Sequence, residues 1–258
     1  MYCQCPNVMI GRRIALLLWL CVMVESHTYA YKTFLPREDW AKVIKAFLPN
    51  PPDSGSLMEA YDRECLIQGK CLREGERGRQ ACEDARWSVE VVGKCFSAAL
   101  GVEISLKNTP QLCLLLEKTM NDAGNASGSV KHFYGRIRPY VACNEGTLVP
   151  EEEESHRKSP SYPSAHACAG WTMALVLSQV CPESMGQLLA RGWEYGQSRV
   201  ISGYHWQSDV DAARIVASAV YCRLQTDKGY KRQLARACKE LIRYKRKMGG
   251  KKKRITHL

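Results

Sequence analysis

Beyond its first thirty residues, the sequence has no apolar run long enough to cross a bilayer as a helix. It also has no Cys-x2-Cys pair after that point, and no histidine stands at metal-ligand spacing from a cysteine pair. These absences argue against a membrane-spanning domain and against a structural zinc site. Alternating apolar and polar residues, the pattern of strands, are scarce as well. We therefore expect a soluble, helical chain without a metal site.

The first thirty residues have the layout of a secretory signal peptide. Two arginines precede an apolar run over residues 14–24, and this run is too short to span a bilayer. Residues 28–30, Thr-Tyr-Ala, match a small-x-small cleavage site. We expect cleavage after Ala30 and export of the mature chain, with an uncleaved anchor as the alternative.

The mature chain of about 228 residues is long enough for one well-buried core. We place a single domain over residues 31–228, and a basic helix and tail over residues 229–258. Residues 228–258 hold 13 Lys or Arg and one Glu, whereas the rest of the mature chain has a net charge of about −2. The positive charge thus belongs to the tail, which is either a docking segment for an anionic surface or a frayed, soluble end.

Ten of the 13 cysteines follow the presumed signal peptide. An even number of cysteines in an exported chain permits disulfide bonds, and we expect one to three bridges. Several of these cysteines lie within apolar helical patterns, where a buried free thiol is the alternative. The sequence does not indicate which cysteines pair.

Apolar residues recur at helical spacing along most of the chain, which predicts an all-α domain. We expect a turn-rich break over residues 121–128 and a loop over residues 139–161. Helices are expected over residues 39–47, 57–69, 75–100, 110–122, 131–136, 164–180, 183–197, 203–223 and 229–246.

Three short stretches carry groups suited to phosphoryl transfer without a metal. The first, residues 131–139, contains Lys131 and Arg138. Fixed cations stabilise the charge that a transferring phosphoryl group spreads over its oxygens, and arginine presents a fork that suits two oxygens at once. Arg136 also lies near, and spacing alone leaves it open as a helper or a bystander.

The second stretch is Pro163-Ser164-Ala165-His166. Ser164 is expected to cap the following helix, whose unpaired N–H groups attract anions. The Ser164 hydroxyl and the Ala165 amide would donate to phosphate oxygens. His166, in the first turn, could act as a general acid because bound phosphate favours its protonated form.

The third stretch contains Arg199, His205 and Asp209. His205 and Asp209 are four residues apart and would share one helix face. A carboxylate on one ring nitrogen fixes the tautomer and leaves the other nitrogen free to attack. Arg199 could turn into the same pocket as a third cation. Each stretch alone also fits an ordinary surface or capping role, whereas the three together indicate a phosphoryl-transfer site.

These residues resemble the signature of the phosphatidic acid phosphatase type 2 superfamily, which is Lys-x6-Arg-Pro, Pro-Ser-Gly-His and Ser-Arg-x5-His-x3-Asp. Within it, the chain is most similar to the class A bacterial non-specific acid phosphatases, over roughly residues 35–225. The resemblance implies an all-α domain of the acid phosphatase/vanadium-dependent haloperoxidase type and export to the periplasm. It further implies hydrolysis of small phosphomonoesters through a phosphohistidine, without metal or other cofactor, by a homo-oligomer, expected to be a dimer.

By motif position, the resemblance makes His205 the nucleophile, Asp209 its orienting partner and His166 the acid for the leaving group. The residues implied to hold the phosphoryl group are Lys131, Arg138, Ser164, Ala165 and Arg199. Ala165 stands where the family motif has glycine, which matters if the backbone there needs a positive φ. Two other functions stay open: a vanadate-dependent haloperoxidase built on the same residues, and a binding module anchored by the basic tail.

Overall fold

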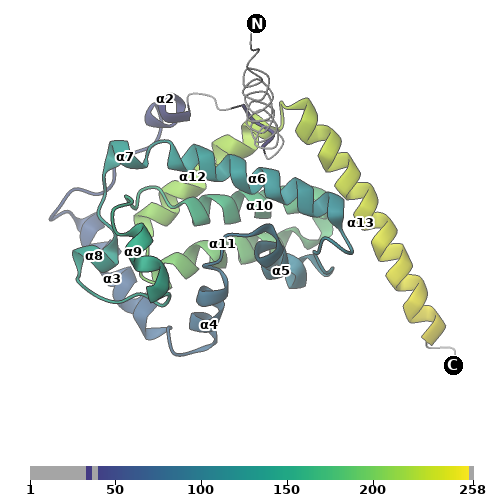
Figure 1. Cartoon of the computed structure of the whole chain (residues 1–258), viewed down its shortest axis with the longest axis horizontal. Coiled ribbons are helices and arrows are strands. Elements are labelled where there is room, and N and C mark those ends of the chain that lie inside the picture. Colours follow the sequence, from purple (N-terminus) through teal and green to yellow (C-terminus); the bar gives the residue numbers. More distant parts are fainter. Residues whose placement is uncertain (1–32, 37–39, 256–258) are drawn as a thin grey trace, which may run out of the picture. The chain divides into compact units, whose positions relative to one another are not determined.

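A computed structural model of the chain describes residues 33–36 and 40–255, with side chains as far as residue 248. Within this part of the chain every regular element is a helix, as the all-α expectation requires (Figure 1). None of the helices described is both long and apolar enough to cross a membrane. The presumed signal peptide lies outside the described residues, so its cleavage stays a prediction.

The helices follow one another through short connections (Figure 1). Their bounds are α2 Trp40–Lys45, α3 Leu57–Cys71, α4 Glu76–Glu83, α5 Val89–Leu100, α6 Pro110–Gly128, α7 Lys131–Tyr134, α8 Pro139–Ala142, η1 Pro150–Glu152, α9 Glu153–His156, α10 Ala165–Val180, η2 Pro182–Ser184, α11 Met185–Ile201, α12 Gln207–Leu224 and α13 Lys228–Ile255.

The helix α10 lies at the centre of the domain and contains no Asp, Glu, Lys or Arg. A helix that is apolar nearly all round is stable only where other elements cover it, and α10 packs against α11, α6 and α12. Two glycines allow α10 and α11 to approach closely. A Cβ on Gly170 would lie 2.3 Å from the ring of Tyr195, and one on Gly192 would lie 2.5 Å from the Cβ of Ala174.

The helix α13 packs against α6 through its first half, where Tyr230 and Leu241 are buried in the core. The Glu240 carboxylate accepts hydrogen bonds from the backbone N–H groups of Gln111 and Leu112, at 3.0 and 2.9 Å. It thereby caps the start of α6, whose first N–H groups have no acceptor within the helix. The packed core therefore continues past residue 228, the expected end of the domain.

The expected helix over residues 75–100 is two helices, α4 and α5, joined by a short connection. The Asp84 carboxylate holds this connection, because it pairs with Arg191 and accepts a hydrogen bond of 2.6 Å from the hydroxyl of Ser198. Ser88 then caps α5. The partners of Asp84 lie 107 and 114 residues further along the chain, so the local apolar pattern could not reveal the break.

The expected break over residues 121–128 is wrong, because α6 continues through it to Gly128. The small residues there serve packing. Ala123 and Ala126 are buried in the core, and a Cβ on Gly124 would lie 3.2 Å from the indole of Trp87. The expected loop over residues 139–161 contains the short helices α8, η1 and α9.

The expected disulfide bonds are also not found, because the ten cysteines in the described part of the chain are all free. Cys113, Cys168 and Cys181 are buried in the apolar core, where a free thiol packs much as a small apolar side chain does, and Cys181 also contacts the ammonium of Lys245. Burial raises the pKa of Cys168 to about 12. Its thiol therefore stays protonated and weakly nucleophilic.

Candidate active site

The three sequence stretches meet at one cavity of about 440 Å³. Six of the predicted residues line this cavity: Lys131, Arg138, Ala165, His166, Arg199 and His205. Ser164 and Asp209 lie just behind them and are fully buried. The backbone N–H of Ser164 donates to the carbonyl of Asp209 at 3.0 Å, which ties the start of α10 to the first turn of α12.

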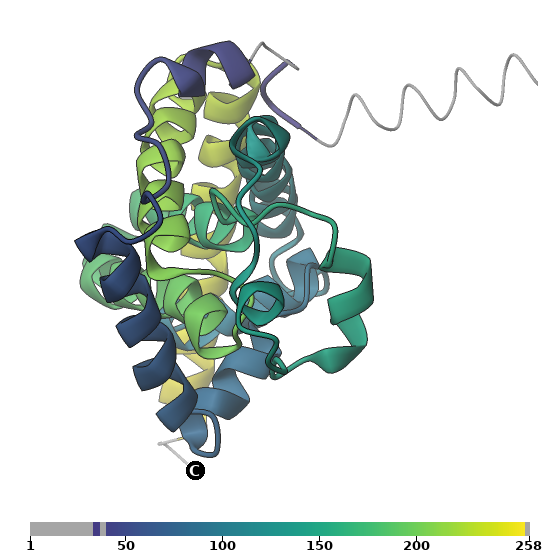
Figure 2. The same ribbon diagram turned by 90° about the vertical axis from the view of Figure 1, so that its left-hand side faces the viewer.

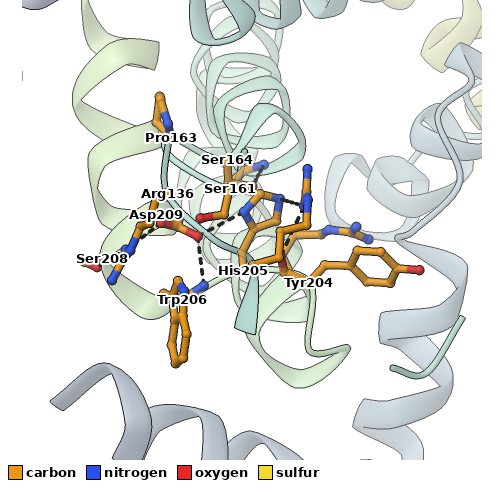
Figure 3. Close-up of polar contacts among 12 residues, drawn as sticks. Arg136, Ser161, Pro163, Ser164, Tyr204, His205, Trp206, Ser208 and Asp209 are labelled. Atoms are coloured by element: carbon orange, nitrogen blue, oxygen red, sulfur yellow. Dashed lines mark hydrogen bonds and ion pairs between the residues drawn. The ribbon is translucent and has the colours of Figure 1, made fainter. Parts of the chain in front are cut away.

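His205 lies between a carboxylate and a guanidinium (Figure 3). Its Nδ1 is 3.2 Å from Oδ2 of Asp209, and its Nε2 is 3.1 Å from Nη1 of Arg138. A carboxylate only accepts and a guanidinium only donates, so the proton sits on Nδ1 and the lone pair on Nε2. The ring thus presents an unprotonated nitrogen toward the guanidinium of Arg138.

The pairing of His205 with Asp209 does not use a shared helix face, because α12 begins only at Gln207. Asp209 instead stands in the first turn of α12 and accepts the backbone N–H of Trp206 at 2.9 Å. This is the carboxylate half of a capping box. The same bond that starts the helix therefore fixes the carboxylate against His205.

Burial lowers the pKa of His205 well below its usual value, and the nearby cations of Arg138, Lys131 and Arg199 lower it further. These influences favour the neutral ring. A neutral imidazole is required for attack on phosphorus, because the protonated ring has no free lone pair.

His166 faces the cavity from the first turn of α10. Its Nε2 is 2.9 Å from the carbonyl of Ala85, so that nitrogen carries a proton. Its ring makes an edge contact with Trp87, with ring centres 4.8 Å apart. Burial and the charge of Arg199 lower the pKa of His166 well below its usual value. An anion bound beside it would oppose this effect.

Lys131 directs its ammonium at the loop before α10. Its Nζ donates to the carbonyls of Pro160, Ser161 and Pro163, at 3.1, 3.1 and 2.8 Å. An ammonium has three donors, so contact with an anion requires the exchange of one of these bonds. Burial and the neighbouring charge of Arg138 lower the pKa of Lys131 to about 7.

Arg138 is held by the same loop and by the chain beside His205. Its Nε donates to the carbonyl of Ser159 at 2.8 Å, and its Nη1 donates to the carbonyl of Tyr204 at 3.1 Å. The remaining contact of Nη1 is the lone pair of His205. Nη1 of Arg138 therefore covers the unprotonated nitrogen of His205, and an anion that entered here would compete for this donor.

Arg199 is a buried cation with unused donors. Its side chain is 1% exposed, and its Nε and Nη1 have no hydrogen-bond partner among the described residues. Its guanidinium lies over the ring of Tyr204, 4.8 Å from the ring centre. Buried N–H groups without acceptors are costly, and Arg199 lines the cavity beside two histidines. The arrangement is suited to binding a multivalent anion.

The start of α10 is capped as predicted. The hydroxyl of Ser164 accepts the backbone N–H of Ala167 at 3.3 Å, so Ser164 is the N-cap. Ala165 is the first helical residue, and its N–H has no acceptor within the helix. In the described part of the chain, Asn144 is the only non-glycine residue with a positive φ. The methyl group of Ala165 therefore causes no backbone strain.

Comparison with known proteins decides the family. The model of the PAP2 superfamily matches residues 112–231. The chain is 40% identical to a non-specific acid phosphatase of Salmonella typhimurium over 229 residues, which cover 88% of this chain and 91% of that protein. It is 43% identical to a non-specific acid phosphatase of Providencia stuartii, with coverages of 78% and 82%. The chain belongs to the PAP2 superfamily.

Further similarity extends to an acid phosphatase of Zymomonas mobilis, at 32% identity over 76% of this chain and 74% of that protein. The resemblance to the bacterial non-specific acid phosphatases that the motifs indicated is therefore confirmed. The all-α fold expected of this PAP2 protein is confirmed as well.

Sequence reasoning missed one residue of this PAP2 site and left the role of another open. Trp87 forms part of the cavity wall and is 39% exposed, but no motif includes it. Arg136, which spacing left open, donates from Nη1 to Oδ1 of Asp209 at 2.6 Å. The Arg136 contact could not be read from spacing because it depends on how the loop before α8 folds against α12.

Proposed function

We propose that the protein is an exported acid phosphatase that hydrolyses phosphate monoesters through a phosphohistidine, without a metal. The observation that carries the proposal is that His205, with Nε2 unprotonated, and buried Arg199, with two unpaired donors, line the same cavity. The names of the relatives, non-specific acid phosphatase and acid phosphatase, support the same reaction.

Substrate binding uses the cations and the start of α10. Arg199 offers its free donors to the phosphoryl oxygens, and Arg138 transfers its Nη1 donor from His205 to the substrate. The Ser164 hydroxyl proton and the Ala165 N–H complete the cradle, where the helix start favours negative charge. Lys131 adds positive charge and shapes the loop through its three carbonyl partners.

In the first step, Nε2 of His205 attacks phosphorus in line with the ester oxygen. The N–P bond forms while the P–O bond to the alcohol breaks. The ring then carries a positive charge, which Asp209 stabilises through the proton on Nδ1. The three cations stabilise the charge on the equatorial oxygens in the transition state.

His166 gives the departing alkoxide its proton. Because burial keeps this ring neutral in the free protein, the proton arrives when a phosphate anion binds. A monoester with one acidic hydrogen can supply it, since the second ionisation of such phosphates lies near about pH 6. In the second step, His166 accepts a proton from water as the water oxygen attacks phosphorus and the N–P bond to His205 breaks. Inorganic phosphate takes this proton back from His166 when it leaves.

The test measures hydrolysis of p-nitrophenyl phosphate in the presence of EDTA by the wild-type protein and by His205→Ala. We expect full activity of the wild type and loss of activity in the variant. A phosphoramidate on His205, trapped by alkaline quenching and identified by mass spectrometry, would support the covalent step. Activity that EDTA abolishes and only a metal restores would contradict the proposal.

Vanadate is expected to inhibit this reaction, because it resembles the trigonal bipyramidal transition state. Bromide oxidation upon addition of vanadate would instead favour the haloperoxidase alternative. Export is tested by fractionation of cells that express the full chain, and the expected homodimer is tested by light scattering. Docking of the basic tail on an anionic surface also stays a prediction.

A further inference from the structure

The two oxygens of the Asp209 carboxylate serve different partners. Oδ2 accepts from Nδ1 of His205 at 3.2 Å and from the N–H of Trp206 at 2.9 Å. Oδ1 accepts from Nη1 of Arg136 at 2.6 Å. Figure 3 shows Arg136 on the side of Asp209 that faces away from His205. The carboxylate therefore stands between a guanidinium and the imidazole.

Other side chains hold the guanidinium of Arg136 in place. Its Nη2 donates to Oδ2 of Asp62 at 2.6 Å, and its Nη1 donates to the hydroxyl of Ser208 at 2.7 Å. Asp62 also accepts the N–H and the hydroxyl of Ser208, at 2.8 and 2.6 Å. The guanidinium lies over the indole of Trp206, 5.5 Å from the ring centre. These contacts hold Arg136 in one orientation.

Asp62 comes from α3, which packs against α12 although the two helices are far apart in the sequence (Figure 2). Asp62 and Asp209 are both fully buried. The result is a line of four groups in which charge alternates: Asp62, Arg136, Asp209 and His205. The imidazole of His205, the last of the four, is neutral at rest and becomes positively charged only when it bonds to phosphorus.

A buried carboxylate without a cation would take up a proton rather than stay charged. Burial raises the pKa of Asp209, and the largest opposing influence is the charge of Arg136. A protonated Asp209 could not stabilise a positive imidazole. It could also turn its hydroxyl toward Nδ1 and favour the wrong tautomer of His205. Arg136 opposes both changes because it binds Oδ1 and leaves Oδ2 to the ring.

We propose that Arg136, held in place by Asp62, is a positioning residue that keeps Asp209 ionised and aimed at His205 during phosphoryl transfer. This inference rests on the proposed function. It assigns to Arg136 a role apart from the phosphate-holding cations, because its donors point to two carboxylates and a hydroxyl. The charged and titratable groups around Asp209 are Arg136, Lys131, Arg138 and His205, with Asp62 behind Arg136.

The variant Arg136→Gln tests the proposal, and Arg63→Gln is its matched control. The guanidinium of Arg63 also lies over the ring of Trp206, at 5.7 Å, but it pairs with the α3 residue Glu59 and not with Asp62 or Asp209. We expect Arg136→Gln to lower kcat by about 10- to 100-fold, the usual effect of removing a partner that orients a reactive group. Arg63→Gln should keep the wild-type kcat.

Two readouts separate positioning from a structural role. In Arg136→Gln the acidic limb of the kcat profile should move to higher pH, because Asp209 then takes up a proton more readily. The affinity for inorganic phosphate should stay within about threefold of the wild type, since the cradle of Arg199 and Arg138 is intact. Arg136→Lys keeps the charge without the fork, and it should return the acidic limb toward the wild-type position while kcat recovers in part.

An unchanged acidic limb in Arg136→Gln would overturn the proposal, as would a parallel loss of kcat, phosphate affinity and thermal stability. A second measurement distinguishes a failure of the proposed function from a failure of the positioning role of Arg136. If the wild-type protein hydrolyses no monoester, the proposed function fails, and the tautomer of His205 is then read by nitrogen NMR. The inference requires a proton on Nδ1 in the wild type and a mixture of tautomers in Arg136→Gln. The same tautomer in both proteins would refute it.

Discussion

Arg199 is expected to destabilise the folded protein while it binds phosphate. The variant Arg199→Met should therefore be more stable but less active than the wild type. Its guanidinium is buried, and two of its donors have no acceptor among the described residues. Methionine has a similar length, carries no charge and fits irregular apolar space. The substitution should therefore remove a cost to folding together with a phosphate-binding group.

The magnitude follows from the contacts of the side chain. Each buried donor without a partner costs about 1–3 kcal/mol, whereas the contact of the guanidinium with Tyr204 contributes about 1 kcal/mol. We therefore expect a net stabilisation of about 2 kcal/mol, within the range of about 1–4 kcal/mol that is typical when buried charges are replaced by apolar groups. For a domain of this size the melting temperature should rise by about 4–8 °C.

The assay combines thermal unfolding, with and without inorganic phosphate, and the kinetics of p-nitrophenyl phosphate hydrolysis. The variant should unfold at a higher temperature and gain little stability from added phosphate. Its kcat should be about 10²- to 10³-fold lower than that of the wild type. In the wild type, phosphate at 100 times its Kd should stabilise by about 2.7 kcal/mol.

The matched control is Arg214→Met. Arg214 is also buried, but its guanidinium pairs with Asp211 at 2.7 Å and lies 3.5 Å from the ring centre of Trp193. Its removal should lower the free energy of unfolding by about 1–3 kcal/mol, the opposite sign. If Arg199→Met is less stable than the wild type, or turns over within tenfold of it, the assignment of its free donors to an anion is refuted.

Four further predictions follow from the site. Ala165→Gly should leave kcat within about twofold and lower the free energy of unfolding by about 0.5 kcal/mol, because the position is helical and glycine is costlier there; a large rise in kcat would show that the methyl group obstructs substrate. Because burial lowers the pKa of His166 well below its usual value, the proposed mechanism takes the proton from the substrate, and the alkaline limb of kcat/KM should follow the second ionisation of the substrate. Profiles for two monoesters with different ionisations check this, and a limb that does not move would contradict it. Trp87→Ala should raise KM about three- to tenfold more for p-nitrophenyl phosphate than for glycerol phosphate, because the exposed indole in the cavity wall can contact an aromatic leaving group; equal changes would exclude such contact. Deletion of residues 247–258, which contain five Lys or Arg, should weaken retention on anionic vesicles in a salt-dependent manner, and unchanged retention would remove the docking role of the tail.

The convergence of the three motifs on one cavity could be predicted because each motif carries its geometry within a few residues. Ser164 signals a helix start, and a helix start signals an anion site. The spacing of His205 and Asp209 also predicted their contact, although the reason differs from the one expected. The contact uses the N-terminal turn of α12, which begins only at Gln207, and not a shared helix face.

The positions that sequence reasoning missed depend on partners far along the chain. Asp62 and Arg136 are 74 residues apart, so the first motif offers Arg136 as a candidate but does not reveal its partners, and no motif includes Asp62. The break between α4 and α5 likewise depends on Asp84, whose partners Arg191 and Ser198 lie on α11. The break also affects the site, because Ala85, the residue after Asp84, supplies the carbonyl that binds His166.

Composition misled the prediction at α6 for a related reason. Its C-terminal turns are rich in Gly, Asn and Ser, which are typical of loops. In the fold these small residues let the indole of Trp87 and the core approach the helix closely. Packing against distant elements decides such a segment, and it outweighs the intrinsic preference of the residues.

The cap that Glu240 places on α6 constrains when the molecule can finish folding. The carboxylate is made 129 residues after the amide of Gln111 that it binds. While the last helix is still inside the ribosomal tunnel, the opening amides of α6 lack their acceptor, and the apolar surface later covered by Tyr230 and Leu241 faces water. Native packing at the start of α6 is therefore expected only after α13 has been synthesised and has left the tunnel.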